Sequence, residues 1–519
     1  MRNLVYDPPF LNPEQVTHSK KIPELFYTLL LFGSAGAIAW AIRGTSGWGG
    51  VDGTLVPGLM WGILWWIIWS CQGLDARHVA LWLGLGIALG GELGYGQYVS
   101  WILGTFYVGN ETMHISPVTG YIWFFICGMG WAAPGGIVLG WALGGNSPAG
   151  RWVVRSLWMI VLLLILFAWP LVDTLALWLA QTWPGLLFPH AGMGIYSGSL
   201  DHHLSRTIYT NTQNALVIVW LIGALLFALL QKDRTTLITG LVLSVGFGFG
   251  FMISAAWCLG YGFAPGYIDW WKMWELNAGF FLGMLYAVVM VWASRHARTK
   301  KESGDPVLQK PLRKSVPRVF TSTLFQALAG AILIFLAGFE YFFWTGLFLA
   351  VFFFFAIMFT LIGKRQREDK ESISNRQKNV MVIYAWFLLW FMLFHGGSER
   401  AGIFLELYSD QAVDQYAWPM ARILIFAPVA TILFLIAVYR MRKIFQSDSR
   451  YLEILFSPRV AVYRLYAIMG GLVFIGALSI WPAKISVFYA LFVWLGVVAS
   501  AHLYSHNAFL NSLSGSPRP

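Results

Sequence analysis

The chain has 519 residues, of which 58% are hydrophobic and only 11% are charged. Soluble domains carry about a quarter charged residues, so this composition excludes an ordinary soluble domain and predicts an integral membrane protein. The net charge of +11 does not indicate a nucleic-acid-binding protein, because the basic residues lie in short segments between apolar runs and not on one basic face.

The first 22 residues are polar and are predicted to form a cytoplasmic segment. They contain Lys20 and Lys21, and the apolar run that follows has no small-residue cleavage site. The first predicted helix is therefore expected to remain in the protein.

Repeated apolar stretches predict an all-α bundle, because about 20 apolar residues are enough for a helix to cross a bilayer. Eight spans are predicted near residues 23–42, 54–71, 79–96, 120–145, 156–180, 213–230, 235–258 and 273–293. Six more are predicted near residues 319–339, 341–362, 380–394, 417–439, 465–482 and 485–504. The total is about fourteen transmembrane helices, although twelve or sixteen also fit the pattern.

The distribution of basic residues predicts that both ends of the chain are cytoplasmic. With this orientation, 29 of the 35 lysines and arginines fall in cytoplasmic segments, which is where basic residues accumulate in membrane proteins. The predicted location is a bacterial cytoplasmic membrane.

The chain divides into two halves of different composition. Residues 23–293 contain 41 of the 54 glycines and 22 of the 28 tryptophans, whereas residues 319–504 are rich in Phe and Ile. A basic cytoplasmic linker, residues 294–318, separates these halves, and residues 505–519 form a predicted cytoplasmic tail. Dense glycines within helices allow the helices to approach closely or to break.

A short string recurs within the first half. Leu-Gly-Tyr-Gly occurs at residues 93–96 and again at residues 259–262, each time at the predicted outer end of a helix. Two parallel four-helix repeats, as found in transporters, would explain the recurrence. A chance match in a glycine-rich chain is the alternative explanation.

The first predicted outer loop combines Arg43 and Asp52 with several intervening and flanking glycines. Backbone N–H groups and a guanidinium suit a carboxylate, phosphate or sulfate. The alternative is an Arg43–Asp52 ion pair that ties a surface turn.

The third predicted helix carries Glu92, with Gln97 just beyond its end. A carboxyl group at such a depth must face protein or water, so Glu92 is either a proton or cation site or a partner of Arg43. The fourth helix contains an Ala-Pro-Gly-Gly string at residues 133–136. This string predicts a helix break that lines a cavity shared with Glu92. Close packing of the helix against its neighbours is the alternative.

Residues 181–212 are predicted to form the longest outer loop. It contains Asp201, His202, His203 and Arg206. If the protein is an enzyme, a histidine would act as acid and base while Arg206 holds an anionic group. No metal site is predicted, because adjacent histidines lack metal-ligand spacing. A solvated loop is the alternative.

Charged residues beside three tryptophans mark the predicted outer start of the eighth helix. Lys272 and Glu275 are three residues apart and can share a helix face; Asp269 precedes them. They predict either an interfacial aromatic belt with a surface ion pair, or a stacking platform for a ring. The outer polar residues are predicted to line one binding vestibule. The second half of the chain is predicted to contribute His395, Glu399 and Arg400 to it.

These placements favour a permease or flippase for a small polar, anionic solute, with a binding vestibule that faces outward. The first alternative is a membrane-embedded transferase that acts on a lipid-linked or envelope glycan, and the second is a structural subunit of a membrane complex. Membrane lipid and a small polar or anionic ligand are the expected partners. No cofactor is expected.

Overall fold

The computed structural model describes the first half of the chain and its last helix. The described residues are 21–43, isolated positions between 54 and 69, 77–108, 111–144, 149–182, 202–302 and 483–513. Five of the six spans predicted after the basic linker lie outside these residues.

The described part of the chain is helical apart from one small hairpin. In chain order its elements are α2 (Lys21–Arg43), α4 (Arg77–Gly90), α5 (Gly96–Ile102), β1 (Thr105–Val108), β2 (Glu111–His114), α6 (Pro117–Leu143), α7 (Ala149–Phe167), α8 (Trp169–Thr182), α10 (His202–Leu230), α11 (Arg234–Ala255), η1 (Ala256–Leu259), α12 (Gly260–Phe263), α13 (Trp270–Glu302) and α24 (Ala483–Leu513). Strands β1 and β2 pair antiparallel, with Thr105 opposite His114.

Four helical segments in the described residues are long and apolar enough to cross a membrane. They are Pro117–Leu143, Thr207–Leu230, Arg234–Phe263 and Trp270–His296. A fifth would be α7 with α8 if this pair, which is bent by 74°, forms one span. The helical membrane class predicted from composition is therefore supported, and α2 and α24 add shorter apolar stretches.

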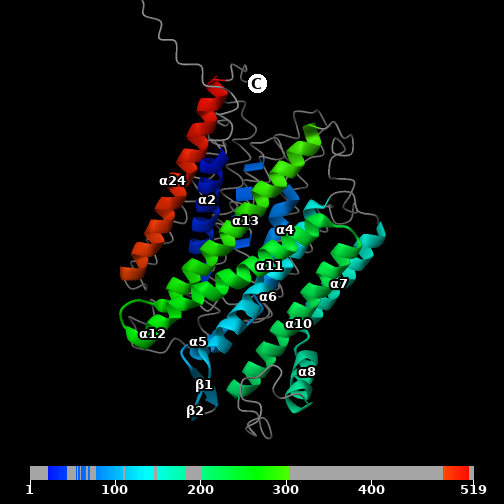
Figure 1. Ribbon diagram of the computed structural model, residues 1–519, viewed down its shortest axis with the longest axis vertical. Coiled ribbons are helices and arrows are strands. Elements are labelled where there is room, and N and C mark those ends of the chain that lie inside the picture. Colours follow the sequence, from blue (N-terminus) through cyan, green and yellow to red (C-terminus); the bar gives the residue numbers. More distant parts are fainter. Residues whose placement is uncertain are drawn as a thin grey trace, which may run out of the picture.

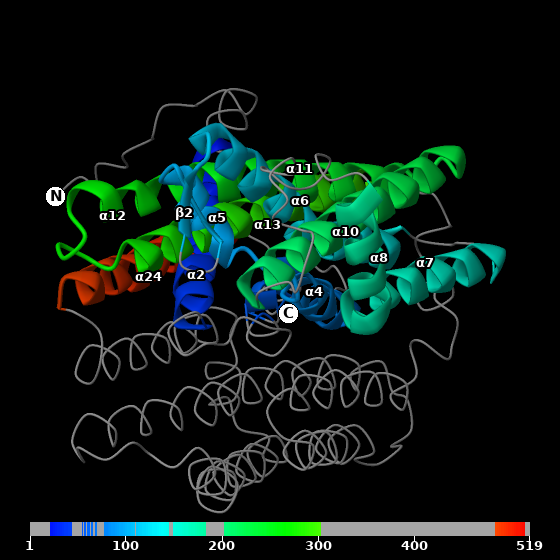
Figure 2. The same cartoon turned by 90° about the horizontal axis from the view of Figure 1, so that it is seen from below.

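Helix α6 occupies the centre of the described bundle. It contacts α4, α5, α10 and α11, while α13 packs against α11 and α2, and α24 covers α2. In the views of Figures 1 and 2, α24 and the α7–α8 pair lie at opposite flanks. Helices α7 and α10 expose apolar side chains such as Leu157, Leu164 and Leu226, as expected of a surface that faces lipid.

Glycines set the spacing of the central helices. A Cβ on Gly90 of α4 would overlap the Trp131 carbonyl oxygen of α6, and a Cβ on Gly36 of α2 would overlap the Gly279 carbonyl oxygen of α13. The backbones therefore touch directly, which larger residues would prevent. The predicted role of these glycines in close packing is confirmed.

The break predicted at residues 133–136 is wrong, because α6 continues through Pro134. The two glycines of the string instead allow neighbouring helices to pack closely against α6. A Cβ on Gly135 of α6 would meet the hydroxyl of Tyr286, and one on Gly86 of α4 would lie 2.6 Å from the Cα of Gly135. Close packing explains the string.

Three other predicted boundaries are corrected by the structure. The span at 156–180 is not one helix, because α7 ends at Phe167 and α8 turns away at 74°. The loop at 181–212 ends early, since α10 begins at His202. The helix at 79–96 ends at Gly90, and the chain beyond it forms α5 and the hairpin, which the sequence did not indicate.

Candidate functional site

The strongest irregularity among the described helices is the gap between α4 and α5. Helix α4 ends at Gly90, Gly91 and Glu92 form a turn, and α5 begins at Gly96. Both pieces pack along α6. Residues 91–95, here called the α4–α5 break, therefore interrupt a helical path through the bundle.

Side chains from two other helices satisfy carbonyl groups that the break leaves without helical partners. Trp131 of α6 donates its indole N–H to the Leu93 carbonyl at 2.9 Å. Asn214 of α10 donates to the Gly94 carbonyl at 3.2 Å, and the Cys127 thiol donates to the same oxygen at 3.6 Å. Freed backbone groups at membrane depth require such partners, so the break is built into the fold.

These caps come partly from a buried polar segment at the start of α10. Residues 207–214, here called the α10 polar run, include the buried side chains Thr207, Thr210, Asn211, Thr212, Gln213 and Asn214. Gln213 donates to the carbonyls of Ile165 and Leu166 at 3.4 and 3.3 Å. These carbonyls lie where α7 ends, so two adjacent residues of α10 support two interrupted helices.

A hydrogen-bonded group joins the α10 polar run to α5. The Tyr98 hydroxyl donates to Oδ1 of Asn211 at 2.8 Å and accepts from Nδ2 of Asn214 at 3.1 Å. Nε2 of Gln97 in α5 is buried and forms no hydrogen bond within the described residues. Oδ1 of Asn214 is buried and receives no hydrogen bond within the described part of the chain.

The opposite side of the break faces a group of aromatic rings. The Tyr95 ring lies 4.9 Å from that of Trp274, 5.8 Å from that of Trp271 and 5.8 Å from that of Trp131, measured between centroids. Phe251 packs edge-on to Tyr95 at 5.7 Å. Tyr95 thus connects the break to the first turns of α13.

The start of α13 contains a buried ion pair between Lys272 and Glu275. The ammonium and carboxylate are 2.5 Å apart, and only 4% and 1% of the two residues are exposed. The Trp271 indole donates to the same carboxylate at 2.9 Å. The predicted sharing of one helix face is confirmed, but the interpretation as a surface ion pair is wrong.

Lys272 also makes a contact outside its own helix. Its ammonium donates to the Ala41 carbonyl at 3.3 Å, and Ala41 lies in the last turn of α2. A cation at the C-terminal end of a helix is stabilised by the helix dipole. Asp269 accepts a hydrogen bond from the Lys272 backbone N–H at 3.1 Å, which fixes the first turn of α13.

The three tryptophans near these charges do not form one stacking platform. Trp270 lies parallel to Trp257, with centroids 6.3 Å apart, and donates to the Ala264 carbonyl. Trp271 and Trp274 are perpendicular to each other and face Tyr95. The backbone N–H of Trp271 donates to the Tyr261 hydroxyl at 3.2 Å, so both tyrosines of the recurring Leu-Gly-Tyr-Gly string contact Trp271.

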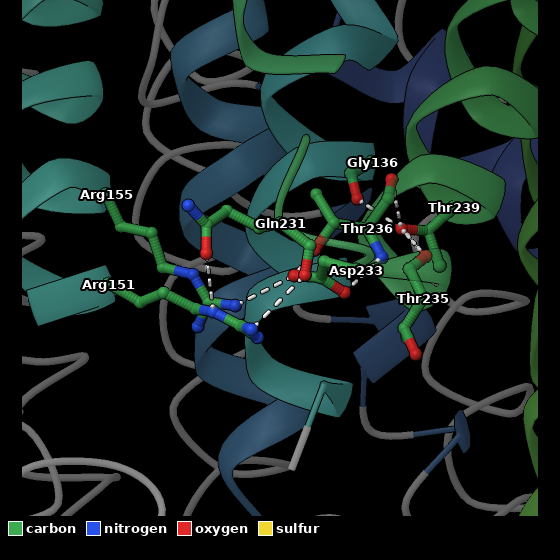
Figure 3. Close-up of polar contacts among 8 residues, drawn as sticks. All are labelled: Gly136, Arg151, Arg155, Gln231, Asp233, Thr235, Thr236 and Thr239. Atoms are coloured by element: carbon green, nitrogen blue, oxygen red, sulfur yellow. Dashed lines mark hydrogen bonds and ion pairs between the residues drawn. The ribbon is translucent and has the colours of Figure 1, made fainter. Parts of the chain in front are cut away.

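A second buried charged cluster connects α7 with the α10–α11 turn (Figure 3). Arg155 and Asp233 form an ion pair at 2.9 Å, with 2% and 9% of their side chains exposed. Asp233 also accepts from the backbone N–H and the hydroxyl of Thr236, which caps α11. Arg151 donates to the side chain and the carbonyl of Gln231.

The structure brings together some of the predicted site residues. Lys272, Glu275 and Asp269 form one group, and Glu92 and Gln97 lie in or next to the α4–α5 break. Glu92 is half-buried and within electrostatic reach of the Tyr209 hydroxyl.

The other predicted site residues are placed in part or not at all. His202, His203 and Arg206 belong to the first turns of α10 and not to a loop, and Arg43 ends α2; only their backbones are described. Lying outside the described residues are Asp52, Asp201, His395, Glu399 and Arg400.

The α10 polar run, Tyr95 of the break and Tyr98 of α5 were not predicted as site residues. The string Thr-Asn-Thr-Gln-Asn at residues 210–214 was an available signal, because five consecutive polar residues at the edge of an apolar helix need buried partners. The cluster around Arg155 and Asp233 was not predicted either.

No family model, curated protein or solved structure matches this chain. Within the described residues, no group of three or more His, Cys, Asp or Glu side chains is arranged to hold a metal ion.

Proposed function

We propose that this protein is a permease or flippase for a small polar solute that carries an anionic group. The observation that carries this proposal is the α4–α5 break beside the buried Lys272–Glu275 pair. Transporters place solute sites at discontinuous helices, where backbone and side chains can exchange partners. Lys272 supplies the positive charge that binds the anionic group. When the solute binds, Lys272 gives up its contact with Glu275 or with Ala41.

The proposal includes the topology expected from the charge distribution, with about fourteen spans and both ends in the cytoplasm. Contacts between helix ends support an alternating arrangement. Ala41 near the end of α2 meets Lys272 near the start of α13, and Trp69 donates to Ser294 toward the other end of α13. The α4–α5 break and the α13 ion pair then belong to the outer side, and the Arg155–Asp233 pair to the inner side.

Accessibility of the break from the two faces of the membrane tests this function whatever the solute is. The experiment places one cysteine at Glu92 in a chain carrying Cys71→Ala, Cys127→Ser and Cys258→Ala. A charged, membrane-impermeant thiol reagent is added to intact cells and to inverted vesicles. A transporter exposes its site to each side in turn, so we expect labelling from both.

The control and the alternative outcomes separate the three functional hypotheses. Leu226→Cys, on the exposed apolar face of α10, is expected to stay unlabelled from either side. Labelling of the residue 92 cysteine from the outer side alone would overturn transport and favour the transferase. Absence of labelling from both sides would favour a structural subunit.

Loss of the Lys272 charge provides a second test. In liposomes containing the purified chain, uptake of radiolabelled phosphate, sulfate, acetate, succinate, glycolate and glycine is compared with protein-free liposomes. Uptake of any solute in this set is expected to fall at least tenfold in Lys272→Met and to be unchanged in Trp178→Phe, whose side chain is exposed on α8. Equal uptake in Lys272→Met would contradict the assigned role of Lys272.

A further inference from the structure

The side-chain nitrogen of Asn214 forms hydrogen bonds, whereas its side-chain oxygen forms none within the described residues. Its nitrogen donates to the Gly94 carbonyl, the Thr210 carbonyl and the Tyr98 hydroxyl at 3.0 to 3.2 Å. These contacts orient the amide and place the oxygen on the opposite side. That oxygen is buried without a donor in the described structure, although buried acceptors are normally paired.

The unused oxygen lies near Gly130 of α6, beside the α4–α5 break. It lies 3.7 Å from the point where a Cβ on Gly130 would stand, so bare backbone is opposite to it. The nearest atom to the same point is the terminal Cδ1 of Leu93 at 2.7 Å. Leu93 belongs to the break, and its backbone is held by hydrogen bonds to Gly90 and Trp131. Its side chain is buried, so a ligand reaches Oδ1 of Asn214 only when this side chain moves.

We infer that the solute carries a hydrogen-bond donor, an ammonium or a hydroxyl, which Oδ1 of Asn214 accepts. This inference rests on the proposed function and narrows its substrate class. On one side of the break, Asn214 donates a hydrogen bond to the Gly94 carbonyl. On the opposite side, the Tyr95 ring contacts Trp271, which precedes Lys272 in the chain. A small amino acid or hydroxy acid carries both a hydrogen-bond donor for Asn214 and an anionic group for Lys272, so its chemistry matches both residues.

Matched pairs of solutes test this class. The probes are glycine and glycolate against acetate, alanine and lactate against propionate, and malate against succinate. Each is assayed on the purified full chain by its protection of the residue 92 cysteine from labelling. In at least one pair, the donor-bearing member is expected to protect at about tenfold lower concentration, because its absence leaves a buried acceptor unpaired.

Gly130→Ser tests the inference by supplying a donor from the protein itself, and Gly130→Ala is the matched control for stability. Both variants add the same Cβ beside Leu93, but only serine brings a hydroxyl within reach of Asn214. Gly130→Ser is expected to abolish the preference for donor-bearing solutes and to melt at a higher temperature than Gly130→Ala, which adds the same Cβ without a hydroxyl. Ser500→Ala, which removes a buried hydroxyl on α24 away from the break, is expected to leave the preference unchanged.

The outcomes distinguish this inference from the proposed function. Equal protection within every pair, a preference that survives in Gly130→Ser, or no protection by any of these solutes would each overturn the inferred class. Labelling from both sides of the membrane would still support transport in those cases. Labelling from one side alone would remove the function on which the inference rests.

Discussion

The two ends of the described bundle each contain a buried ion pair, but the pairs are built differently. Arg155 and Asp233 come from different elements and hold α7 against the α10–α11 turn, and Asp233 also caps α11. Lys272 and Glu275 lie one turn apart on α13, so their contact joins no separate elements. The bond from Lys272 to the Ala41 carbonyl reaches α2.

This difference indicates different roles for the two pairs. A pair that joins elements must stay closed for the structure to hold, whereas a pair within one helix can exchange partners without separating any elements. The break and its aromatic neighbours adjoin the second pair. The proposed function accordingly assigns the ligand to the end that contains Lys272 and a structural role to the Arg155–Asp233 pair.

The largest expected loss of stability follows substitution of Asp233. Asp233→Ala leaves the buried Arg155 guanidinium without its carboxylate and removes the α11 cap, so we expect a loss of about 3–5 kcal/mol in the free energy of unfolding. Denaturation with sodium dodecyl sulfate in mixed micelles measures this value. Asp173→Ala, at an exposed position on α8, is the control and is expected to change stability by less than about 0.5 kcal/mol. A similar small effect for Asp233→Ala would contradict its structural role.

Removal of whole pairs sharpens the comparison. Lys272→Met alone should destabilise by about 3 kcal/mol, because it leaves the buried Glu275 carboxylate unpaired. Adding Glu275→Gln removes that charge and keeps an acceptor for Trp271, so the double variant should recover most of the loss. Arg155→Met with Asp233→Asn should recover less, since α7 and α11 lose their connection. Equal recovery for the two pairs would break the proposed distinction.

Disrupting the backbone contact between α4 and α6 is expected to lower stability by nearly as much as disrupting an ion pair. Gly90→Ala drives a Cβ into the Trp131 carbonyl and should cost about 1–3 kcal/mol. Gly96→Ala is the matched control, because no atom lies within 4 Å of its added Cβ. Thermal melting in detergent should show a lower midpoint for Gly90→Ala only, and equal midpoints would mean that the helices are not fixed by this contact.

The smallest expected effect concerns the cap on the break. Trp131→Phe keeps an aromatic ring but removes the donor to the Leu93 carbonyl, so we expect a loss of about 1–2 kcal/mol. Trp178→Phe is the control, since its indole is exposed on α8. Hydrogen exchange around residues 91–95 should rise in Trp131→Phe, and unchanged exchange would show that the cap does not hold the break.

Some features of the site could be predicted from the sequence because they depend on local spacing. Lys272 and Glu275 are three residues apart, which places them on one face of any helix. The glycine runs predicted close packing because a residue without a Cβ permits backbone contact wherever a neighbouring helix lies. Their partners, Trp131 for Gly90 and Gly279 for Gly36, could not be predicted, since they are distant in sequence.

The sequence by itself determined that the chain is a helical membrane protein, because apolar length and sparse charge decide which solvent the helices require. Only the tertiary structure decided that the helix at 79–96 stops at Gly90 while α6 continues through Pro134. Both segments contain glycine or proline, and each outcome depends on whether side chains from other helices satisfy the backbone. Trp131 and Asn214 supply those hydrogen bonds at the break, and they meet it only in the folded bundle.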